Sequence, residues 1–387
     1  MLEKPIKITI INRSFWPVYP VIGEALLWFA EGAAKRDHFV SVVMQDHVGI
    51  KGKLAEAGRG EGVQFYPTKA LTTSASGTLF RAFDALFFTL WVMVVLLWVR
   101  PSRVYVSTDP PIVVPFIVMI YSQLFGAEYI YHLQDIHPEA TNVVIPVNKW
   151  IYKLLLKMDA LSMRKATRLI TITDQMATEI RSRSQTKAPI NVLANPAVSF
   201  DGIDTSKPKI SGFSFCGNAG RMQRIPLILS AIETYFKQGG ELDFTFAGGG
   251  VYANHLKDFS KKFSHFHYRG LVSSTEAAQI NADYTWALLP VEDEVTRFAF
   301  PSKSSSYVFS GANILAVCSE ETSVAQWVNA NRVGLVVKPN VEAIVETFFD
   351  IEKGAFQYLS DEESRDLLKA GLRFEVFIEA LDRVVLG

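Results

Sequence analysis

Short apolar runs alternate with longer amphipathic stretches along most of the chain. The runs have the length of buried strands, and the stretches between them repeat apolar residues at helical spacing. In the first half, the expected strands are 8–11, 40–44, 104–107, 129–132 and 169–173, and the expected helices are 25–35, 80–99, 112–125 and 150–164. This alternation predicts βαβ units and a parallel sheet with helices on both faces.

The same alternation restarts near residue 213, after a polar, proline-containing stretch at 201–209. A chain of 387 residues is also long for a single core. We therefore predict an α/β protein of two Rossmann-like, doubly wound parallel-sheet domains, 1–200 and 201–370, that face one another across a cleft. Residues 371–387 are expected to form a helix that packs back toward the first domain. In the second half, the expected strands are 213–216, 244–247, 284–289, 314–317 and 334–337, and the expected helices are 225–237, 254–262, 275–281, 324–331 and 341–349.

Residues 300–317 predict a loop, a short helix and a buried strand. Pro301 and Ser302 suit the first positions of a helix, and Gly311 suits its end. Lys303 would lie beside the N-terminus of this helix, where free backbone amides favour anions. This combination is suited to a ligand that carries phosphate.

Glycine-bearing loops follow the strands of the second half. Glycine lets the backbone approach a ligand closely, and arginine adds positive charge where a diphosphate could lie. The residues concerned are Gly217, Asn218, Arg221, Arg224, Gly248 and Gly249. A glycine turn with two solvated arginines is the alternative for the first loop, but the recurrence of such loops together with Lys303 favours a phosphate site.

Residues 131–139 concentrate two histidines and two carboxylates at the end of an expected strand. The segment lacks cysteine and a further histidine group, so an acid–base or sugar-binding role for Asp135 and His137 fits better than a metal site. His132 is interpreted as a core histidine. Asp109 follows the preceding strand and is expected to face the same cleft.

The loop after the first strand, 12–23, is rich in aromatic residues and proline. With Arg13 and Trp16, it suits a rigid wall for an acceptor or, equally, a contact between the domains. The acidic segment 292–294 could bind sugar hydroxyls, although a solvated loop is slightly favoured.

Composition narrows the range of partners. Lys+Arg 39 balances Asp+Glu 39, so the net charge gives no indication of a nucleic-acid partner. Cys216 and Cys318 lie in apolar runs and are expected to be buried free thiols. The N-terminal residues lack the pattern of a signal peptide.

Two segments have the composition of membrane-contacting helices. Residues 85–99 are apolar except for Thr89 but fall short of the roughly 20 residues of a spanning helix. A buried helix is the first interpretation and a membrane-docking helix the second. Residues 150–168 mix five basic residues with Leu, Ile and Met, as surface-bound helices do, although an ordinary solvated face would look the same.

Taken in order, these motifs resemble those of family 4 (group 1) retaining glycosyltransferases with the two-domain GT-B architecture. The chain is most similar to bacterial O-antigen and capsule enzymes of the fucosaminyltransferase kind. The resemblance rests on Gly23, His38, Asp109, residues 134–139, Ile172, residues 217–221, residues 248–250 and residues 301–311.

The resemblance implies transfer of a sugar, with retention, from a nucleotide diphosphate sugar to a lipid-linked saccharide in surface-polysaccharide biosynthesis. The donor is expected to be UDP-linked, and no metal or other cofactor is expected. The enzyme would be cytoplasmic and peripheral to the inner face of the cytoplasmic membrane. The implied catalytic residues are Asp135, His137, Arg221 and Lys303. The implied donor-binding residues are Gly217, Asn218, Arg221, Arg224, Gly248, Gly249, Lys303, Ser306, Glu320 and Glu321, and the implied acceptor-side residues are Arg13, Trp16, Gly23, Asp109 and Glu139.

The chain departs from the family pattern at two positions around the donor site, and Asp37 replaces the glycine usual before His38. Phe298 and Ser306 stand where the family commonly has two glutamates, of which the second holds the ribose of the donor. The Ser306 hydroxyl can hydrogen-bond a ribose less strongly than a carboxylate does, and Glu320 or Glu321 could substitute. Two other functions stay open: a nucleotide-sugar 2-epimerase-like enzyme and a non-catalytic nucleotide-sugar-binding assembly partner.

Overall fold

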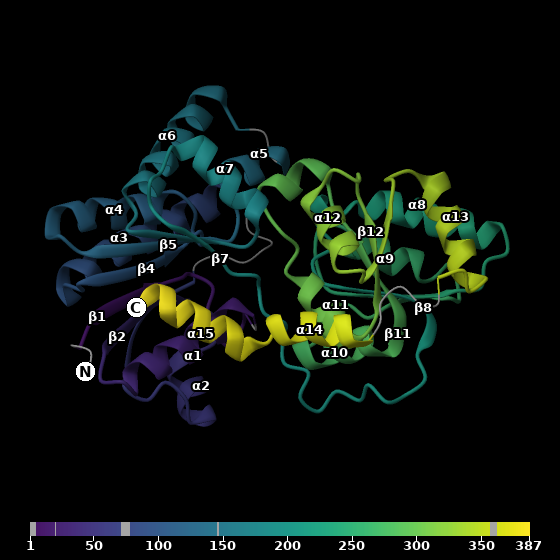
Figure 1. Cartoon of the computed structure of the whole chain (residues 1–387), viewed down its shortest axis with the longest axis horizontal. Helices are drawn as coiled ribbons and strands as arrows, with labels where there is room; N and C mark the ends of the chain where they lie inside the picture. Colours follow the sequence, from purple (N-terminus) through teal and green to yellow (C-terminus); the bar gives the residue numbers. More distant parts are fainter. Residues whose placement is uncertain (1–4, 20, 71–77, 145–146, 357–361) are drawn as a thin grey trace. The chain divides into compact units, whose positions relative to one another are not determined.

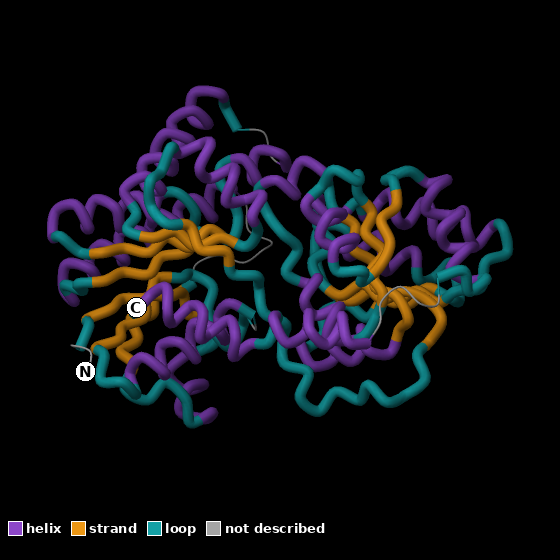
Figure 2. The backbone as a smooth tube through the Cα atoms, in the orientation of Figure 1, coloured by secondary structure: helices purple, strands orange, loops and turns teal. Residues whose placement is uncertain are grey.

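A computed structural model describes residues 5–19, 21–70, 78–144, 147–356 and 362–387. The chain divides into two compact units. Unit 1 comprises Met1–Asn195 and Phe377–Gly387, and unit 2 comprises Pro196–Val376. Each unit is an α/β structure built on one parallel sheet, as expected from the alternation of apolar runs and amphipathic stretches (Figure 2).

The sheet of unit 1 has seven strands in the order β3-β2-β1-β4-β5-β6-β7 (Figure 1). The order changes direction between β1 and β4, so the connections that follow these two strands go to opposite faces of the sheet. Ligands of doubly wound sheets bind at such a point, outside the carboxyl ends of the strands. The strands are β1 (Lys7–Ile11), β2 (Phe39–Asp46), β3 (Val63–Lys69), β4 (Arg103–Ser107), β5 (Glu128–Leu133), β6 (Arg168–Thr171) and β7 (Ile190–Val192).

Helices cover both faces of this sheet (Figure 1). Right-handed crossovers place α1 and α2 on one face, together with the C-terminal α15, and α3, α4, α6 and α7 on the other. On the second face α4 packs between α3 and α6. The helices of this unit are α1 (Ile22–Ala34), α2 (Ile50–Ala57), α3 (Thr78–Val99), α4 (Val113–Phe125), α5 (Glu139–Val144), α6 (Lys149–Lys165) and α7 (Asp174–Ser184), and α15 spans Phe374–Val385.

The sheet of unit 2 has six strands in the order β10-β9-β8-β11-β12-β13, with the change of direction between β8 and β11. The strands are β8 (Ile210–Cys216), β9 (Asp243–Ala247), β10 (Phe266–Tyr268), β11 (Tyr284–Pro290), β12 (Asn313–Val317) and β13 (Gly334–Val337). The α-helices are α8 (Ile225–Lys237), α9 (Ala253–Phe259), α10 (Ser274–Asp283), α11 (Lys303–Ser310), α12 (Ser323–Ala330), α13 (Val341–Glu352) and α14 (Glu362–Gly371).

Aromatic side chains fill one side of the unit 2 core. The Phe213 ring stacks on Phe244 with centroids 5.2 Å apart, and Phe348 of α13 lies 4.9 Å from Phe213. Such pairs add stability beyond the area that they bury. Cys216 and Cys318 are buried and free, which confirms that prediction.

The elements of unit 1 that the sequence pattern did not predict include α2, β3 and β7. The helix α2 buries only Ile50 and Leu54, so its apolar face is too narrow to stand out. The strand β3 contains Pro67 and is mostly half-buried, as an edge strand can be. The opposite edge strand, β7, has only three residues.

The helix α3 is not the buried helix that was the first interpretation of residues 85–99. One face packs on the sheet, with Phe88 and Val92 fully buried. The other face is equally apolar but exposed, up to 81% at Trp98. The first interpretation is therefore wrong, because burial of a helix depends on how many neighbours cover it and not on its composition. No helix in the described part of the chain is long and apolar enough to cross a bilayer.

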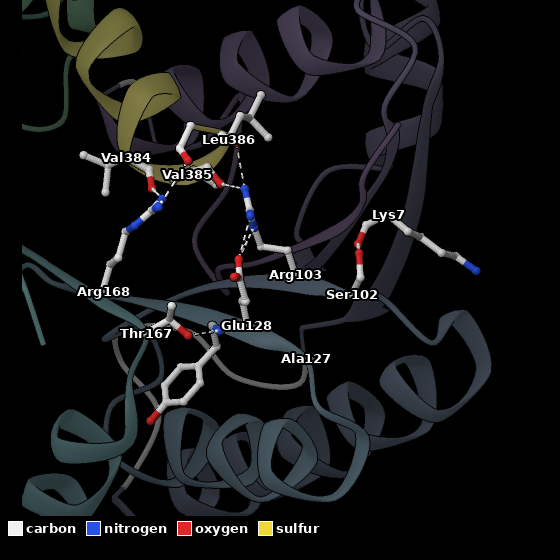
Figure 3. A network of polar contacts seen from close by, with 12 residues as sticks. Lys7, Ser102, Arg103, Ala127, Glu128, Thr167, Arg168, Val384, Val385 and Leu386 are labelled. Atoms are coloured by element: carbon white, nitrogen blue, oxygen red, sulfur yellow. Dashed lines mark hydrogen bonds and ion pairs between the residues drawn. The ribbon is translucent and has the colours of Figure 1, made fainter. Parts of the chain in front are cut away.

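The C-terminal residues of α15 are held by two arginines of the unit 1 sheet (Figure 3). Arg103 donates to the carbonyls of Val385 and Leu386, both at 2.8 Å, and Arg168 donates to that of Val384 at 2.6 Å. These are the last carbonyls of a helix, where cations are favoured. Two residues far apart in the sequence thus anchor the end of the chain.

Candidate functional site

The loops that follow β8 and β9 meet at the carboxyl edge of the six-stranded sheet, next to the switch point between β8 and β11. The Gly217 amide donates to the Ala247 carbonyl at 2.9 Å, and the Ala219 amide donates to the Gly249 carbonyl at 2.7 Å. The loop after β8 is thereby fixed against the loop after β9. These are the glycine loops that the sequence assigns to a phosphate-bearing ligand.

The glycines of these loops are required for their close packing. Gly248 and Gly250 have φ of 127° and 131°, which other residues rarely adopt. A Cβ on Gly248 would lie 2.0 Å from the Gly217 carbonyl oxygen, and one on Gly250 would lie 2.5 Å from that of Ala219. A Cβ on Gly249, in contrast, would meet only the Leu271 side chain. Loop packing therefore accounts for Gly248 and Gly250 without reference to a ligand.

Lys303, the first residue of α11, reaches the loop after β8. Its Nζ lies 3.8 Å from the centroid of the Phe215 ring. A Cβ on Gly217 would lie 3.0 Å from the same Nζ, so the glycine makes room for the lysine. Burial lowers the pKa of Lys303 to about 7. Within the described residues no carboxylate forms a salt bridge with this amine, so an arriving anion would meet a cation that lacks a counter-ion.

Arg224 lies near this edge but is fully engaged by other loops. Its Nη1 and Nη2 lie 3.2 Å and 3.0 Å from the carboxylates of Glu292 and Asp293, and its Nε donates to the Val291 carbonyl at 2.7 Å. Asp293 also accepts from the Ser319 amide at 2.9 Å. The interpretation of segment 292–294 as a solvated loop is therefore wrong, because two of its carboxylates balance Arg224 and tie three loops together.

Arg221 and Asn218 are the exposed members of the first loop. Arg221 opens a short 3-10 turn, Arg221–Gln223, and forms no ion pair within the described part of the chain. The Gly220 amide that precedes it donates to Gln223 Oε1 at 3.0 Å, which holds the turn. Of the two arginines in this loop, Arg221 is thus the one whose charge is available.

The three residues considered for ribose binding, Ser306, Glu320 and Glu321, lie in two different segments of unit 2. Ser306 lies one turn along α11 from Lys303 and is 8% exposed. Glu320 and Glu321 lie exposed in the turn between β12 and α12. Ser306 is therefore on the same element as Lys303, whereas the two glutamates follow the next strand of the sheet.

A second polar cluster occupies the switch point of unit 1, between β1 and β4. Arg13 follows β1, and its Nη2 lies 2.9 Å from Asp109 Oδ1. The Ser14 amide donates to the other carboxylate oxygen of Asp109 at 2.9 Å. Two residues assigned to the acceptor side are thus paired with each other.

Asp135 and His137, which follow β5, are electrostatically coupled to this pair. Burial and the neighbouring Asp109 carboxylate raise the pKa of Asp135 to about 6. Burial and Arg183 lower the pKa of His137 to about 4, and its Nδ1 lies 2.9 Å from Thr141 Oγ1. At pH 7 the cluster therefore presents an ionised Asp135 and a neutral His137. No convergence of three or more His, Cys, Asp or Glu side chains suited to a metal ion occurs in the described residues.

Glu139 contacts a buried network that the sequence pattern does not predict. Its carboxylate lies 2.8 Å from Arg183 Nη1, and the other arm of Arg183 lies 2.5 Å from Asp159, which is fully buried. Tyr131 donates to Asp159 at 2.7 Å. Asp159 and Arg183 lie on different helices, α6 and α7, and no signal in the sequence pairs them. The Glu139 carboxylate is therefore engaged in an ion pair with Arg183, which gives this residue a structural role.

Trp16 lies in the loop before α1, and Gly23 lies in the first turn of that helix. A Cβ on Gly23 would lie 2.5 Å from the Trp16 backbone nitrogen, so the glycine allows the loop to cross the helix. Trp16 is half-buried in that loop. The prediction for His132 as a core histidine is confirmed, since it is fully buried with Nδ1 at 2.5 Å from Tyr105 Oη.

Residues 22–196 match the Glycosyl transferase 4-like domain. The matched region begins with α1 and includes the polar cluster around Asp109 and Asp135. A probable glycosyltransferase from Pseudomonas aeruginosa, WbjE, is 23% identical over 256 residues, which cover 62% of this chain. The alignment spans 64% of that relative, just under two thirds.

Solved structures share the fold across almost the whole chain. HepE from Anabaena, solved in complex with UDP, has a TM-score of 0.66 at 12% identity and covers 98% of this chain and 100% of its own. WaaG, a glycosyltransferase involved in lipopolysaccharide biosynthesis, has a TM-score of 0.64 at 12% identity with the same coverage. The domain match thus covers much of the first half of the chain, and the solved structures share its two-domain GT-B fold.

Proposed function

We propose that this protein transfers a sugar from a nucleotide diphosphate sugar, UDP-linked, to a lipid-linked saccharide in surface-polysaccharide biosynthesis, with retention and without a metal ion. The observation that carries the proposal is Lys303. Its amine lies beside Gly217, at the N-terminus of α11 and at the switch point of the second sheet. A diphosphate bound there would meet backbone amides and a cation together.

The chemistry follows from where charge develops. As the bond between the anomeric carbon and the leaving phosphate oxygen breaks, negative charge grows on the diphosphate while the acceptor oxygen bonds to the same face of the sugar. Lys303 and Arg221 are the cations assigned to that charge, and such preorganised groups are worth most in the transition state. The proton of the acceptor hydroxyl passes to the departing phosphate.

The polar cluster of unit 1 is assigned to the acceptor. Asp135, with a pKa of about 6, accepts hydrogen bonds from sugar hydroxyls at neutral pH, and neutral His137 can donate or accept. Trp16 is the half-buried aromatic side chain of the neighbouring loop. The UDP complex of HepE and the lipopolysaccharide pathway of WaaG agree with the donor and acceptor classes proposed.

A donor panel tests the proposal. The full chain is incubated with UDP-, GDP- and dTDP-sugars and a lipid diphosphate-linked monosaccharide, and products are analysed by mass spectrometry and by NMR for the anomeric configuration. We expect acceptor-dependent elongation that falls by about 10²–10³ in Lys303→Ala and also falls in Arg221→Ala. Exposed Lys187→Ala serves as the control and should be unaffected.

The other results would contradict the proposal in distinct ways. Isomerisation of the donor sugar without any acceptor product would establish the epimerase. Binding of the nucleotide sugar without turnover in any mixture would establish a non-catalytic binder. A product with inverted configuration at the anomeric carbon would support a glycosyltransferase but contradict the proposed retention.

A further inference from the structure

We propose that the exposed sides of α3, α4 and α6 form one surface that inserts into the interfacial region of an anionic lipid bilayer. We call it the three-helix face. The three helices are neighbours on the same side of the unit 1 sheet, with α4 in the middle (Figure 1). The inference goes beyond the proposed function, because it concerns a helical surface that contributes no residue to the candidate site.

The helix α3 is apolar on its covered side and on its uncovered side. Residues 85–99 contain no charged side chain, although half of this helix faces solvent. Exposed apolar residues recur at helical spacing, at Phe83, Leu86, Leu90, Val94, Leu97 and Trp98, with exposed fractions from 44% to 81%. A helix of a water-soluble surface would place polar residues there. An exposed apolar patch of this kind marks an interaction site.

The neighbouring helices extend the apolar surface. α4 has no charged residue, and Leu124 near its end is 71% exposed. On α6, Trp150 is 83% exposed and Leu154, one turn later, is 58% exposed. Exposed tryptophans on both α3 and α6 suit the membrane interface, where indole rings are enriched.

The charges on α6 identify the occupant as anionic lipid. Lys149, Lys153 and Lys157 recur every four residues and form one exposed row beside the row of Trp150 and Leu154. The single acidic residue of α6, Asp159, is buried and paired with Arg183. A second copy of the chain docked symmetrically on this face would bring such lysine rows together, which is unfavourable, whereas anionic headgroups neutralise them.

The position of the face suits delivery of a lipid-linked acceptor, a link that rests on the proposed function. α4 begins at Val113, four residues after Asp109, and α6 begins with the lysine row. α4 follows β4 directly and α6 follows β5 after the short α5, so the chain comes to both helices from the carboxyl edge of the sheet, where the polar cluster lies. A lipid held on the three-helix face would therefore have its headgroup near this edge.

Vesicle flotation of the full chain tests the inference. Vesicles of phosphatidylcholine, with and without phosphatidylglycerol, are used at low and high salt. We expect binding to the anionic vesicles that weakens about tenfold in Leu90→Glu, since a carboxylate replaces an inserted side chain. Lys153→Ala should weaken it about fivefold. The controls are Leu271→Glu, an 86% exposed leucine of unit 2, and Lys51→Ala on the opposite face of the unit 1 sheet.

Glycosyl transfer to a soluble saccharide acceptor separates this inference from the proposed function, because Leu90→Glu should leave that activity unchanged. Equal loss of vesicle binding in Leu90→Glu and Leu271→Glu would overturn the inference. So would a wild-type dimer in light scattering that becomes monomeric in Leu90→Glu without any vesicle binding, since a second copy would then occupy the face. Vesicle binding that persists at high salt in the wild type and in Leu271→Glu, but is lost in Leu90→Glu, would support insertion.

Discussion

At the scale of single residues, the structure separates groups that pack from groups that remain available to a ligand. Gly248 and Arg224 both stand in the segments that predict a phosphate site. Gly248 is required by the contact of two loops, and Arg224 is balanced by two carboxylates. Lys303 and Arg221 have no such partners in the described residues. The same residue types thus have different roles, and only their neighbours distinguish them.

The packing role of Gly248 can be measured as stability. Gly248→Ala should lower the free energy of unfolding by about 2–3 kcal/mol, because a Cβ would lie 2.0 Å from a carbonyl oxygen at a φ unsuited to alanine. Gly52→Ala on α2, where nothing lies within 4 Å, should instead stabilise by up to about 1 kcal/mol. Chemical denaturation of both variants checks this. Equal effects would exclude loop packing as the reason for Gly248.

Lys303 should make stability depend on pH. Its folded pKa of about 7 is below the ordinary lysine value, so between pH 7 and 8.5 the unfolded chain binds more protons and the free energy of unfolding rises with pH. The expected contribution over this interval is about 1–2 kcal/mol. Lys209, with a pKa of about 8, contributes in the same direction. Urea unfolding of Lys303→Met at both pH values should show a smaller rise than the wild type; an unchanged rise would contradict the assignment.

At the scale of elements, the network of Glu139, Arg183 and Asp159 holds α5, α6 and α7 together. Burial raises the pKa of Asp159, and Arg183 opposes that rise. The ion pair between them is therefore needed to keep a charged Asp159 in the interior.

Removal of Arg183 should expose that dependence. Arg183→Met leaves the Asp159 carboxylate buried without its cation and should cost about 3–5 kcal/mol. Addition of Asp159→Asn should recover part of the loss, since no charge is then buried. Because the folded pKa of Asp159 is raised, the single variant should also regain stability as the pH falls. Thermal unfolding at two pH values checks both results, and a double variant no more stable than Arg183→Met would contradict them.

At the scale of the whole molecule, the last residues of the chain complete the core of unit 1. Residues Phe377–Gly387 belong to that unit although the rest of its chain ends at Asn195. Leu381 of α15 is fully buried, and Arg103 and Arg168 hold the end of the helix. The stability of unit 1 thus depends on a segment that is separated from the rest of this unit, along the sequence, by all of unit 2.

Calorimetry can resolve this dependence. Leu381→Ala should destabilise unit 1 by about 2–4 kcal/mol, as loss of a buried leucine does elsewhere. Val376→Ala on the same helix is the control, because Val376 is 39% exposed. Two units permit two unfolding transitions, so each is followed separately. An effect of Leu381→Ala only on the transition of unit 2 would show that α15 does not stabilise unit 1.

The sequence by itself determined the fold class, most strand and helix positions, and the segments that form the candidate site. Strands buried on both faces need continuous apolar runs, and helix ends need proline, serine or glycine, so these features are local. Only the tertiary structure decided that Arg224 and Glu139 are paired and that one side of α3 is uncovered. Those outcomes depend on which distant residues lie opposite, as Asp293 does for Arg224, and spacing along the chain carries no information about that.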